Sequence, residues 1–416
     1  MLQHVVIDQV IEAAPARVVV TEDSHGVVQQ AAFDLTGLPR VDAFLVGRPV
    51  AEVPDLVQRL CGICPWAHHL AGVRALEALA GLVEIPPTAM AVRRLLHYAG
   101  VISIHAVSWM ATQAPDALVL RRFAKAAMTA AGSPGHFPVT ARPGGVEQAV
   151  EPGLRDACAA MVAQTLAAAR RLAESCLNQP SAPDSFRGSD VALVDDRGAL
   201  DMFGSILRAV ASDGSIVASG TAEEWDLLVA EALPGSPAPR PYLVGLGSGQ
   251  GGYRVGPVAQ LRVGQVSTPE AATLQQRWRQ SSGGAGAARA IITLHAVETI
   301  AELLEAPPLV SGPTRAEWSG QVSASVGVGM VDATRGLLVH RYVTDEDARV
   351  ADATILTPTA QNEPWLGELL HTAATTASLS GAKAAMEEAI HEVDPCLPCS
   401  SAPPGAMDLA VDVTRN

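Results

Sequence analysis

The sequence has 416 residues, of which 48% are hydrophobic, and it carries a formal net charge of −14. A chain of this length and composition can bury a large core, whereas its acidic balance excludes the concentrated positive charge that a nucleic-acid surface needs. Because no apolar run reaches the roughly 18 residues that span a bilayer, and because the first residues lack the basic region of a secretory signal, we expect a cytoplasmic protein with no membrane span and no nucleic-acid partner.

The first predicted element is a β-hairpin. Residues 17–33 alternate apolar and polar side chains on both sides of a His25-Gly26 turn. The pattern then becomes helical, breaks at a pair of cysteines, and resumes as a helix that begins at Pro65, because the missing N–H of proline needs no partner at the first helical position. Further helices are predicted near residues 87–112, 116–131, 148–177, 269–305 and 366–392.

The remaining strands are predicted in two places. Residues 180–265 are rich in Gly, Pro and Ser, and short alternating pieces there indicate a smaller α+β insertion. A last strand pair is predicted within residues 336–356, with Thr344 to Asp347 as its turn. We therefore expect one large, predominantly helical α+β domain over residues 1–416, without internal repeats, in four regions: 1–48 with the hairpin, 49–178 and 266–416 as helical core, and 180–265 as the insertion.

Four of the six cysteines form two CxxC pairs at helix–loop junctions. Cys61 and Cys64 lie in "RLCGICPWAH", and Cys396 and Cys399 lie in "DPCLPC" near the other end of the chain, in a tight loop that follows a helix. A short, stiff segment of this kind lets two thiolates face one metal ion. The other two cysteines stand alone in helical patterns typical of small buried apolar residues.

Several kinds of site use paired cysteines. A disulfide framework is not expected in a long chain without an export signal. A Cys₄ zinc site normally has its halves tens of residues apart, a redox dithiol should follow a strand, and c-type haem needs a histidine directly after the second cysteine. Zinc therefore stays a minority alternative, and a cluster or mixed-metal centre with thiolates from both ends of the chain is compatible with the pattern.

Together, the two pairs resemble the signatures of the large subunit of nickel-iron hydrogenases, RxCGxCxxxH and DPCxxC. The segments "HAVSWMATQAPD", "TRGLLVHRY" and "TPTAQN" are similar to that family in the same order. The resemblance covers about residues 8–413, is weakest at 180–330, and is closest in style to the soluble NAD(P)-linked hydrogenases. It implies a large-subunit-like fold with a central bundle of long helices, an N-terminal β-hairpin and small peripheral β segments.

The resemblance implies a role for each matching cysteine. Cys61 and Cys396 would be terminal ligands of nickel, whereas Cys64 and Cys399 would bridge nickel to an iron that carries carbon monoxide and cyanide. Glu12 would transfer protons beside Cys396. Without the resemblance, a surface glutamate is the simpler interpretation of Glu12.

A second set of side chains would surround the iron ligands. By the same resemblance, Arg335 would donate hydrogen bonds to one cyanide and Thr359 to the other. Asp116 and Asp394 would orient Arg335, since a buried cation needs paired anions. Each aspartate could instead cap a helix or a turn.

Two histidines also match the family, and several positions differ from its motifs. His68 would lie near the bridging thiolates, and His105 has either a weaker form of the same role or that of an ordinary core histidine. "VIEAAP" lacks the arginine and histidine that flank the family's glutamate, and Thr334 replaces a proline. Ala402 stands where the family has the histidine at which its C-terminal tail is removed. That histidine also helps hold a magnesium or iron ion with a carboxylate at the position of Asp42, so we expect a weakened second metal site and leave tail removal open.

The resulting interpretation is an enzyme, the catalytic subunit of a cytoplasmic nickel-iron hydrogenase that catalyses H₂ ⇌ 2H⁺ + 2e⁻. The chain has too few spare cysteines for a cluster of its own, so electrons would pass to iron-sulfur clusters in a separate small subunit. Diaphorase-type NAD(P)/flavin subunits are the further partners that the resemblance implies. Two alternatives stay open: a hydrogen-sensing or regulatory homologue with slow turnover, and a metal-free scaffold in a redox complex.

Overall fold

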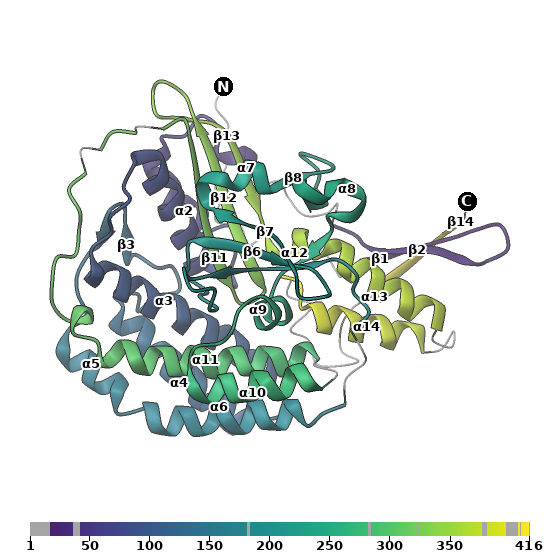
Figure 1. Ribbon diagram of the computed structural model, residues 1–416, viewed down its shortest axis with the longest axis horizontal. Coiled ribbons are helices and arrows are strands. Elements are labelled where there is room, and N and C mark those ends of the chain that lie inside the picture. Colours follow the sequence, from purple (N-terminus) through teal and green to yellow (C-terminus); the bar gives the residue numbers. More distant parts are fainter. Residues whose placement is uncertain are drawn as a thin grey trace. The chain divides into compact units, whose positions relative to one another are not determined.

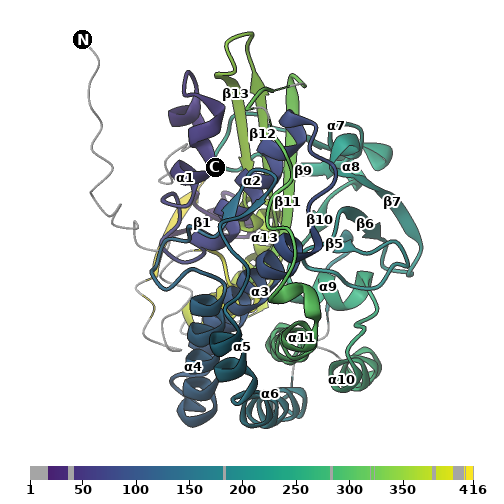
Figure 2. The same cartoon turned by 90° about the vertical axis from the view of Figure 1, so that its left-hand side faces the viewer.

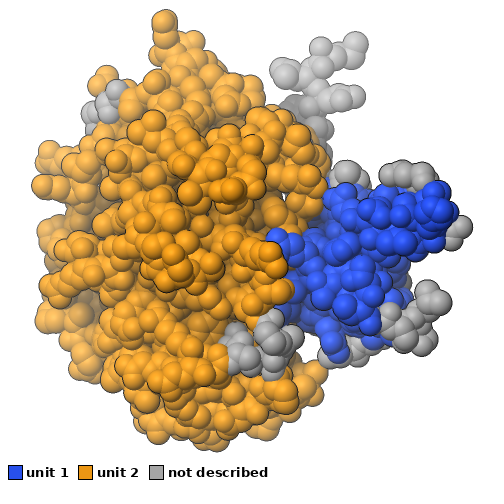
Figure 3. All heavy atoms as spheres, turned by 45° about the vertical axis from the view of Figure 1, so that its right-hand side comes forward, with its two compact units in different colours: residues 1–39, 366–416 blue, residues 40–365 orange. Residues whose placement is uncertain are grey.

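The computed structural model describes residues 17–35, 42–180, 184–281, 284–318, 320–322, 324–376, 381–396, 407 and 409–415. Glu12, Cys399 and Ala402 therefore lie outside the described residues. The chain forms two compact units, unit 1 from residues 1–39 and 366–416 and unit 2 from residues 40–365 (Figure 3). No helix within the described ranges is long and apolar enough to cross a bilayer.

Unit 1 contains a three-stranded sheet in the order β14-β1-β2. Strands β1 (Arg17–Glu22) and β2 (Val28–Phe33) form the predicted antiparallel hairpin, whose turn is held by two backbone N–H groups donating to the Asp23 carboxylate. Strand β14 (Ala410–Arg415) pairs with β1 in parallel, which the sequence pattern did not predict. The helix predicted at 366–392 is two helices, α13 (Glu363–Thr376) and α14 (Ala382–Val393).

Most of the long helices of unit 2, but not α2, gather at one end of that unit (Figures 1 and 2). Helix α11 contacts α3, α6 and α10, and α4 contacts α3 and α6. Because α11 is apolar on nearly all of its faces, it is the central helix of this group. The bounds are α2 Pro65–Ala80, α3 Pro87–His105, α4 Ala114–Ala130, α5 Pro152–Ala159, α6 Val162–Leu177, α10 Pro269–Gln280 and α11 Ala285–Glu305.

Unit 2 also contains two larger sheets that pack on a shared core. One has the order β11-β12-β13, and the other, within the predicted insertion, has the order β10-β5-β6-β7. The predicted last strand pair is β12 (Gly336–Thr344) with β13 (Val350–Leu356), and β11 (Val326–Ala333) is an additional strand that pairs with β12. The second sheet consists of β5 Ser189–Val194, β6 Ile206–Val210, β7 Ile216–Thr221 and β10 Tyr253–Arg254.

Two glycines allow α2 to lie directly against the backbone of β11. A Cβ atom built on Gly329 would stand 2.1 Å from the carbonyl oxygen of Ala71, and one on Gly327 would stand 2.3 Å from that of Ala75. Any larger residue would push the helix away from the sheet. This close packing brings the first turns of α2, which follow the first cysteine pair, next to the sheet that contains β12.

Candidate metal centre

Cys61 and Cys64 lie in a tight turn immediately before α2. Cys64 is the last non-helical residue, and Pro65 occupies the first turn as predicted. The backbone N–H groups of Ile63 and Cys64 both approach the Cys61 sulphur at 3.4 Å, and the two sulphur atoms are 3.2 Å apart. Amide dipoles aimed at a sulphur atom stabilise its thiolate form, so the turn favours metal binding.

His68 lies one helical turn after Cys64 and completes a group of three possible ligands. The two sulphur atoms and a ring nitrogen of His68 lie within 4.8 Å of one another. Cys64 and His68 are each 5% exposed, and Cys61 is partly exposed. In the part of the chain that the structure describes, this is the one group of three or more His, Cys, Asp or Glu side chains close enough to share a metal ion.

The donor set suits a soft transition metal. Thiolates and imidazole select ions such as nickel, iron, copper or zinc, whereas magnesium and calcium prefer oxygen ligands. Because metal–thiolate bonds are about 2.3 Å long, two sulphur atoms at this separation can both reach one ion. The pair at one end of α2 therefore fits half of the predicted four-cysteine centre.

Arg335 lies in the two-residue turn between β11 and β12 and is 5% exposed. Two glycines with positive φ hold this turn against residues 255–256: a Cβ on Gly256 (φ 107°) would stand 2.8 Å from the Arg335 carbonyl oxygen, and one on Gly336 (φ 122°) would stand 2.5 Å from the Gly256 nitrogen. His105 supports the same turn, since its Nε2 lies 2.9 Å from the carbonyl oxygen of Thr334.

Both ring nitrogens of His105 are occupied, because its Nδ1 lies 2.9 Å from the hydroxyl of Thr293. These contacts connect His105 with α11 and with the Arg335 turn, and its predicted role beside the thiolates stays a prediction. They place it among the core residues that position Arg335, in line with the alternative that the sequence left open.

Thr359 belongs to the same region of unit 2. It lies on the short helix α12 (Pro358–Gln361) and is 7% exposed. Two residues at the end of this helix hold it in place: Gln361 donates a hydrogen bond to the carbonyl of Leu337 on β12, and the Asn362 amide group exchanges hydrogen bonds with the backbone of Val255. The segments that carry Arg335 and Thr359 are thus both fixed to residues 255–256.

Asp116 has a partner other than the one that the resemblance implied. Its carboxylate accepts two hydrogen bonds from the Arg171 guanidinium, at 2.5 and 3.2 Å, where α4 packs on α6. Arg171 is largely exposed, so the pair contributes little to stability. The interaction holds two helices together and leaves the orienting role of Asp116 beside Arg335 without support.

The other predicted residues fall in separate places. Asp42 is 7% exposed at the start of a short 3₁₀ helix (Asp42–Leu45) of unit 2, and its carboxylate accepts the N–H of Ala43. Asp394, in unit 1, follows α14 in a left-handed conformation (φ 52°) and is followed by the partly exposed Cys396. The convergence of Cys396 and Cys399 with the first pair stays a prediction.

Sequence reasoning missed two further side chains that adjoin the site. His340 and Tyr342 lie on the same face of β12, and both are fully buried. The Nε2 of His340 lies 3.0 Å from the Nδ1 of His68, and its Nδ1 lies 2.5 Å from the Tyr342 hydroxyl. Burial, followed by the neighbouring His68, holds the pKa of His340 well below its usual range. The two-residue spacing within "LLVHRY" is the signal that could have indicated a shared face.

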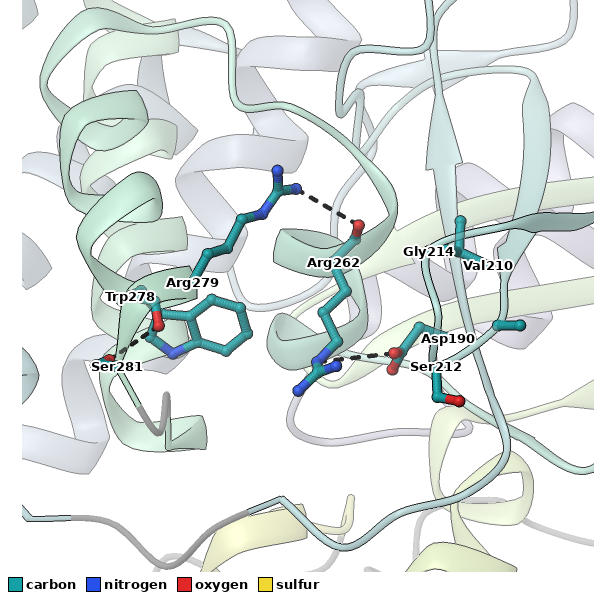
Figure 4. Close-up of a pocket in the computed structure, with 9 residues that line it drawn as sticks. Asp190, Val210, Ser212, Gly214, Arg262, Trp278, Arg279 and Ser281 are labelled. Atoms are coloured by element: carbon teal, nitrogen blue, oxygen red, sulfur yellow. Dashed lines mark hydrogen bonds and ion pairs between the residues drawn. The ribbon is translucent and has the colours of Figure 1, made fainter.

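A pocket of about 210 Å³ elsewhere in unit 2 offers no comparable chemistry. Figure 4 shows Arg262 directed at Asp190, and Arg279 donating to the backbone of Arg262. Arg262 also pairs with Asp184. The charged groups around this pocket are therefore already engaged within the chain.

The comparisons with known proteins agree with the motifs. Residues 40–141 match the family described as nickel-dependent hydrogenase. A vhu-type F420-non-reducing hydrogenase subunit of Methanococcus voltae is 31% identical over 86% of this chain and 94% of its own length. The beta subunit of the NAD-reducing hydrogenase HoxS of Cupriavidus necator is 27% identical over 99% of this chain and 97% of its own length.

The fold agrees as well. The structure of an NAD⁺-reducing [NiFe]-hydrogenase in the H₂-reduced state has a TM-score of 0.81 and 28% identity, and the match covers 94% of this chain and all of that one. The predominantly helical α+β class predicted from sequence is confirmed. With this similarity along nearly the whole chain, the protein belongs to the nickel-dependent hydrogenase family, as a large, catalytic subunit.

Proposed function

We propose that this chain interconverts H₂ with two protons and two electrons. The observation that carries the proposal is the Cys61, Cys64 and His68 group at the start of α2, in a chain of the hydrogenase family. Family membership implies a nickel-iron centre, which when bound would polarise H₂ and take up its electron pair. The iron would carry the carbon monoxide and cyanide ligands that the sequence motifs imply.

The cysteines and Glu12 have separate roles, as the resemblance implies: the cysteines bind the metals and Glu12 transfers protons. Cys61 and Cys396 would bind nickel alone, and Cys64 and Cys399 would bind both metals. With the centre bound, a terminal thiolate would accept the proton released from H₂, and Glu12 would pass that proton on toward solvent. Thiolate and carboxylate are suited to these steps because both can hold and release a proton.

Arg335 and Thr359 would bind the cyanide ligands from unit 2. The burial of the Arg335 turn and its fixation to residues 255–256 support this role, because a rigid guanidinium donates hydrogen bonds without reorganising. Asp394 would orient Arg335, whereas the contact of Asp116 with Arg171 argues for a structural role of Asp116. Asp42 would contribute to a second, weaker magnesium or iron site, since Ala402 supplies no imidazole.

The electrons would leave through an iron-sulfur small subunit. Similarity to a NAD-reducing hydrogenase subunit favours NAD(P) as the final acceptor, reached through diaphorase-type subunits. Such an acceptor agrees with the cytoplasmic location that the sequence predicts. The F420-non-reducing relatives are as similar in sequence, so reduction of NAD⁺ or NADP⁺ by the whole complex under H₂ is the measurement that identifies the acceptor.

Infrared spectroscopy of the chain copurified with its small subunit tests the proposal. We expect carbon monoxide and cyanide stretching bands together with nickel, and sustained reduction of a dye by H₂. Arg335→Lys should keep the bands and the nickel while cutting turnover sharply, and Glu12→Gln should slow H/D exchange. A protein without nickel and without these bands would contradict the proposal and favour a metal-free scaffold.

A regulatory homologue is the second candidate. The observation in its favour is Ala402, which replaces the histidine at which the family's tail is removed. This candidate predicts the same infrared bands but only slow H₂-dependent dye reduction. NAD⁺ and NADP⁺ offered to the whole complex then distinguish a nicotinamide-linked enzyme from a sensor.

A further inference from the structure

A continuous string of buried polar groups leads from the metal centre into the core of unit 2. It consists of His68, His340 and Tyr342, joined by contacts of 3.0 and 2.5 Å. The string begins on α2 and continues along one face of β12. The hydroxyl of Tyr342 ends in the apolar cluster that includes Val57, Leu76 and Leu79.

The direction in which this string donates its hydrogen bonds follows from its two ends. A neutral imidazole has one donor and one acceptor nitrogen, so fixing one bond of the string fixes all of them. If His68 donated through Nδ1, His340 would donate to Tyr342, and the hydroxyl proton would need an acceptor. In the described part of the chain, His340 is the hydrogen-bond partner found for that hydroxyl.

The opposite direction leaves no donor unsatisfied. Tyr342 donates to Nδ1 of His340, the Nε2–H of His340 donates to Nδ1 of His68, and Nε2 of His68 bears a proton. A buried donor without an acceptor costs about 1–3 kcal/mol, whereas an unused lone pair on a hydroxyl costs less. With Nδ1 engaged, Nε2 is the nitrogen of His68 that can face the sulphur atoms, where a proton is attracted to thiolate and a lone pair is repelled.

We propose that Tyr342 and His340 are positioning residues that hold His68 as the Nε2–H tautomer, so that it donates a hydrogen bond to a thiolate of the Cys61/Cys64 pair and is not itself a metal ligand. This inference rests on the proposed function of that pair. A hydrogen bond to a thiolate withdraws electron density from the metals that the sulphur binds. Tyr342 thereby changes the electron density of the centre through His340 and His68.

The packing around the string is built to keep it in place. Gly72, one helical turn after His68, lets α2 pack closely on the preceding segment, because a Cβ there would stand 2.9 Å from Val57 and 3.3 Å from Pro54. Gly327 and Gly329 bring α2 close enough to the sheet for His68 to reach His340. The contact between His68 and His340 is therefore a consequence of close helix–sheet packing at Gly327 and Gly329.

The tautomers can be measured in the full chain without metal. In protein labelled with ¹⁵N in its histidine rings, we expect the shifts of both His68 and His340 to show a protonated Nε2 and a bare Nδ1. The signals are assigned by their loss in His68→Gln and His340→Gln. In Tyr342→Phe, which removes only the hydroxyl, His340 should shift toward a mixture of tautomers and His68 should follow.

Tyr98→Phe is the matched control. Tyr98 is equally buried, and its hydroxyl interacts with Asp201, away from the string. In the loaded complex, Tyr342→Phe should move the carbon monoxide and cyanide bands to lower wavenumber, and Tyr98→Phe should leave them in place. A His68 that carries its proton on Nδ1, or on both nitrogens, would overturn the inference, as would wild-type tautomers in Tyr342→Phe. Absence of the infrared bands from every protein contradicts the proposed function instead, because the tautomer measurement does not need the metals.

Discussion

Arg17, at the start of β1, forms an ion pair with Asp412 on β14, which comes from the other end of the sequence. Six consecutive residue pairs join the two strands, from Arg17 with Ala410 to Glu22 with Arg415. Leu409, just before β14, is buried, as is Met407. The C-terminal segment is thus an integral part of the sheet of unit 1.

Deleting residues 407–416 should destabilise unit 1. The deletion removes two buried side chains, each worth about 1.5–3 kcal/mol, and reduces the three-stranded sheet to the β1–β2 hairpin, which is less stable than three strands. Hydrogen exchange followed by mass spectrometry should show faster exchange over residues 17–33. Arg17→Ala, which breaks the ion pairs of this half-exposed side chain with Asp412 and Asp34, should change exchange little. Unchanged protection of β1 in the deletion would mean that β14 does not stabilise the sheet.

Gly336→Ala should displace the Arg335 turn. Its φ of 122° is unfavourable for alanine, and the new Cβ would collide with Gly256 and Val255. We expect the free energy of unfolding, measured by urea denaturation, to fall by about 1–3 kcal/mol. Gly153→Ala is the control, because Gly153 lies on α5 with open space around it and an ordinary φ. Equal stability of the two variants would show that the turn tolerates the displacement.

The sequence predicted elements whose signals are local. Proline at the first turn indicated the start of α2, and alternation on both sides of a turn indicated the β1–β2 hairpin. The helix predicted at 269–305 is two helices, and the first of them ends before Ser281. The sequence "SGG" that follows Ser281 is typical of a helix break. The helix predicted at 148–177 is two helices separated by Ala160 and Met161. No glycine or proline at these positions indicates the break.

Contacts between residues that are distant in the sequence could not be predicted from local patterns. A strand pattern carries no information about which strand it joins, so the parallel pairing of β14 with β1 was not foreseen. The glycines of β11 look like strand breakers, yet they admit α2. Asp116 was assigned by resemblance to Arg335, and only the packing of α4 on α6 reveals its contact with Arg171.

Asp332 should make the stability of unit 2 depend on pH. It is fully buried and accepts hydrogen bonds from the Gln260 amide and the Leu193 N–H. Burial raises its pKa from 3.8 to about 7. Between those values the folded protein keeps a proton that the unfolded carboxyl group releases, so stability falls as the pH rises from about 4 to about 7 and then levels off.

Asp332→Asn isolates this effect, because the amide does not titrate. The difference in the free energy of unfolding between wild type and Asp332→Asn should shift against wild type by a few kcal/mol over that pH window, since each pKa unit is worth about 1.4 kcal/mol. Buried His97 and His295, whose pKa values fall to about 4, act in the opposite direction, but they are present in both proteins and cancel. A difference that stays constant with pH would mean that Asp332 is ionised throughout.

Replacing single cysteines by serine should separate ligands from core residues. Cys61→Ser and Cys64→Ser each remove one soft donor from a pair of sulphur atoms 3.2 Å apart, and a serine hydroxyl does not replace a thiolate as a ligand of nickel. Cys158 is the matched control, since it is buried on α5 and burial raises the pKa of its thiol to about 11, which keeps it protonated and inert. Metal analysis of the purified complexes should find nickel at background in the first two variants and at the wild-type level in Cys158→Ser. Nickel retained in Cys61→Ser would exclude that thiol as a ligand, whatever the family resemblance implies.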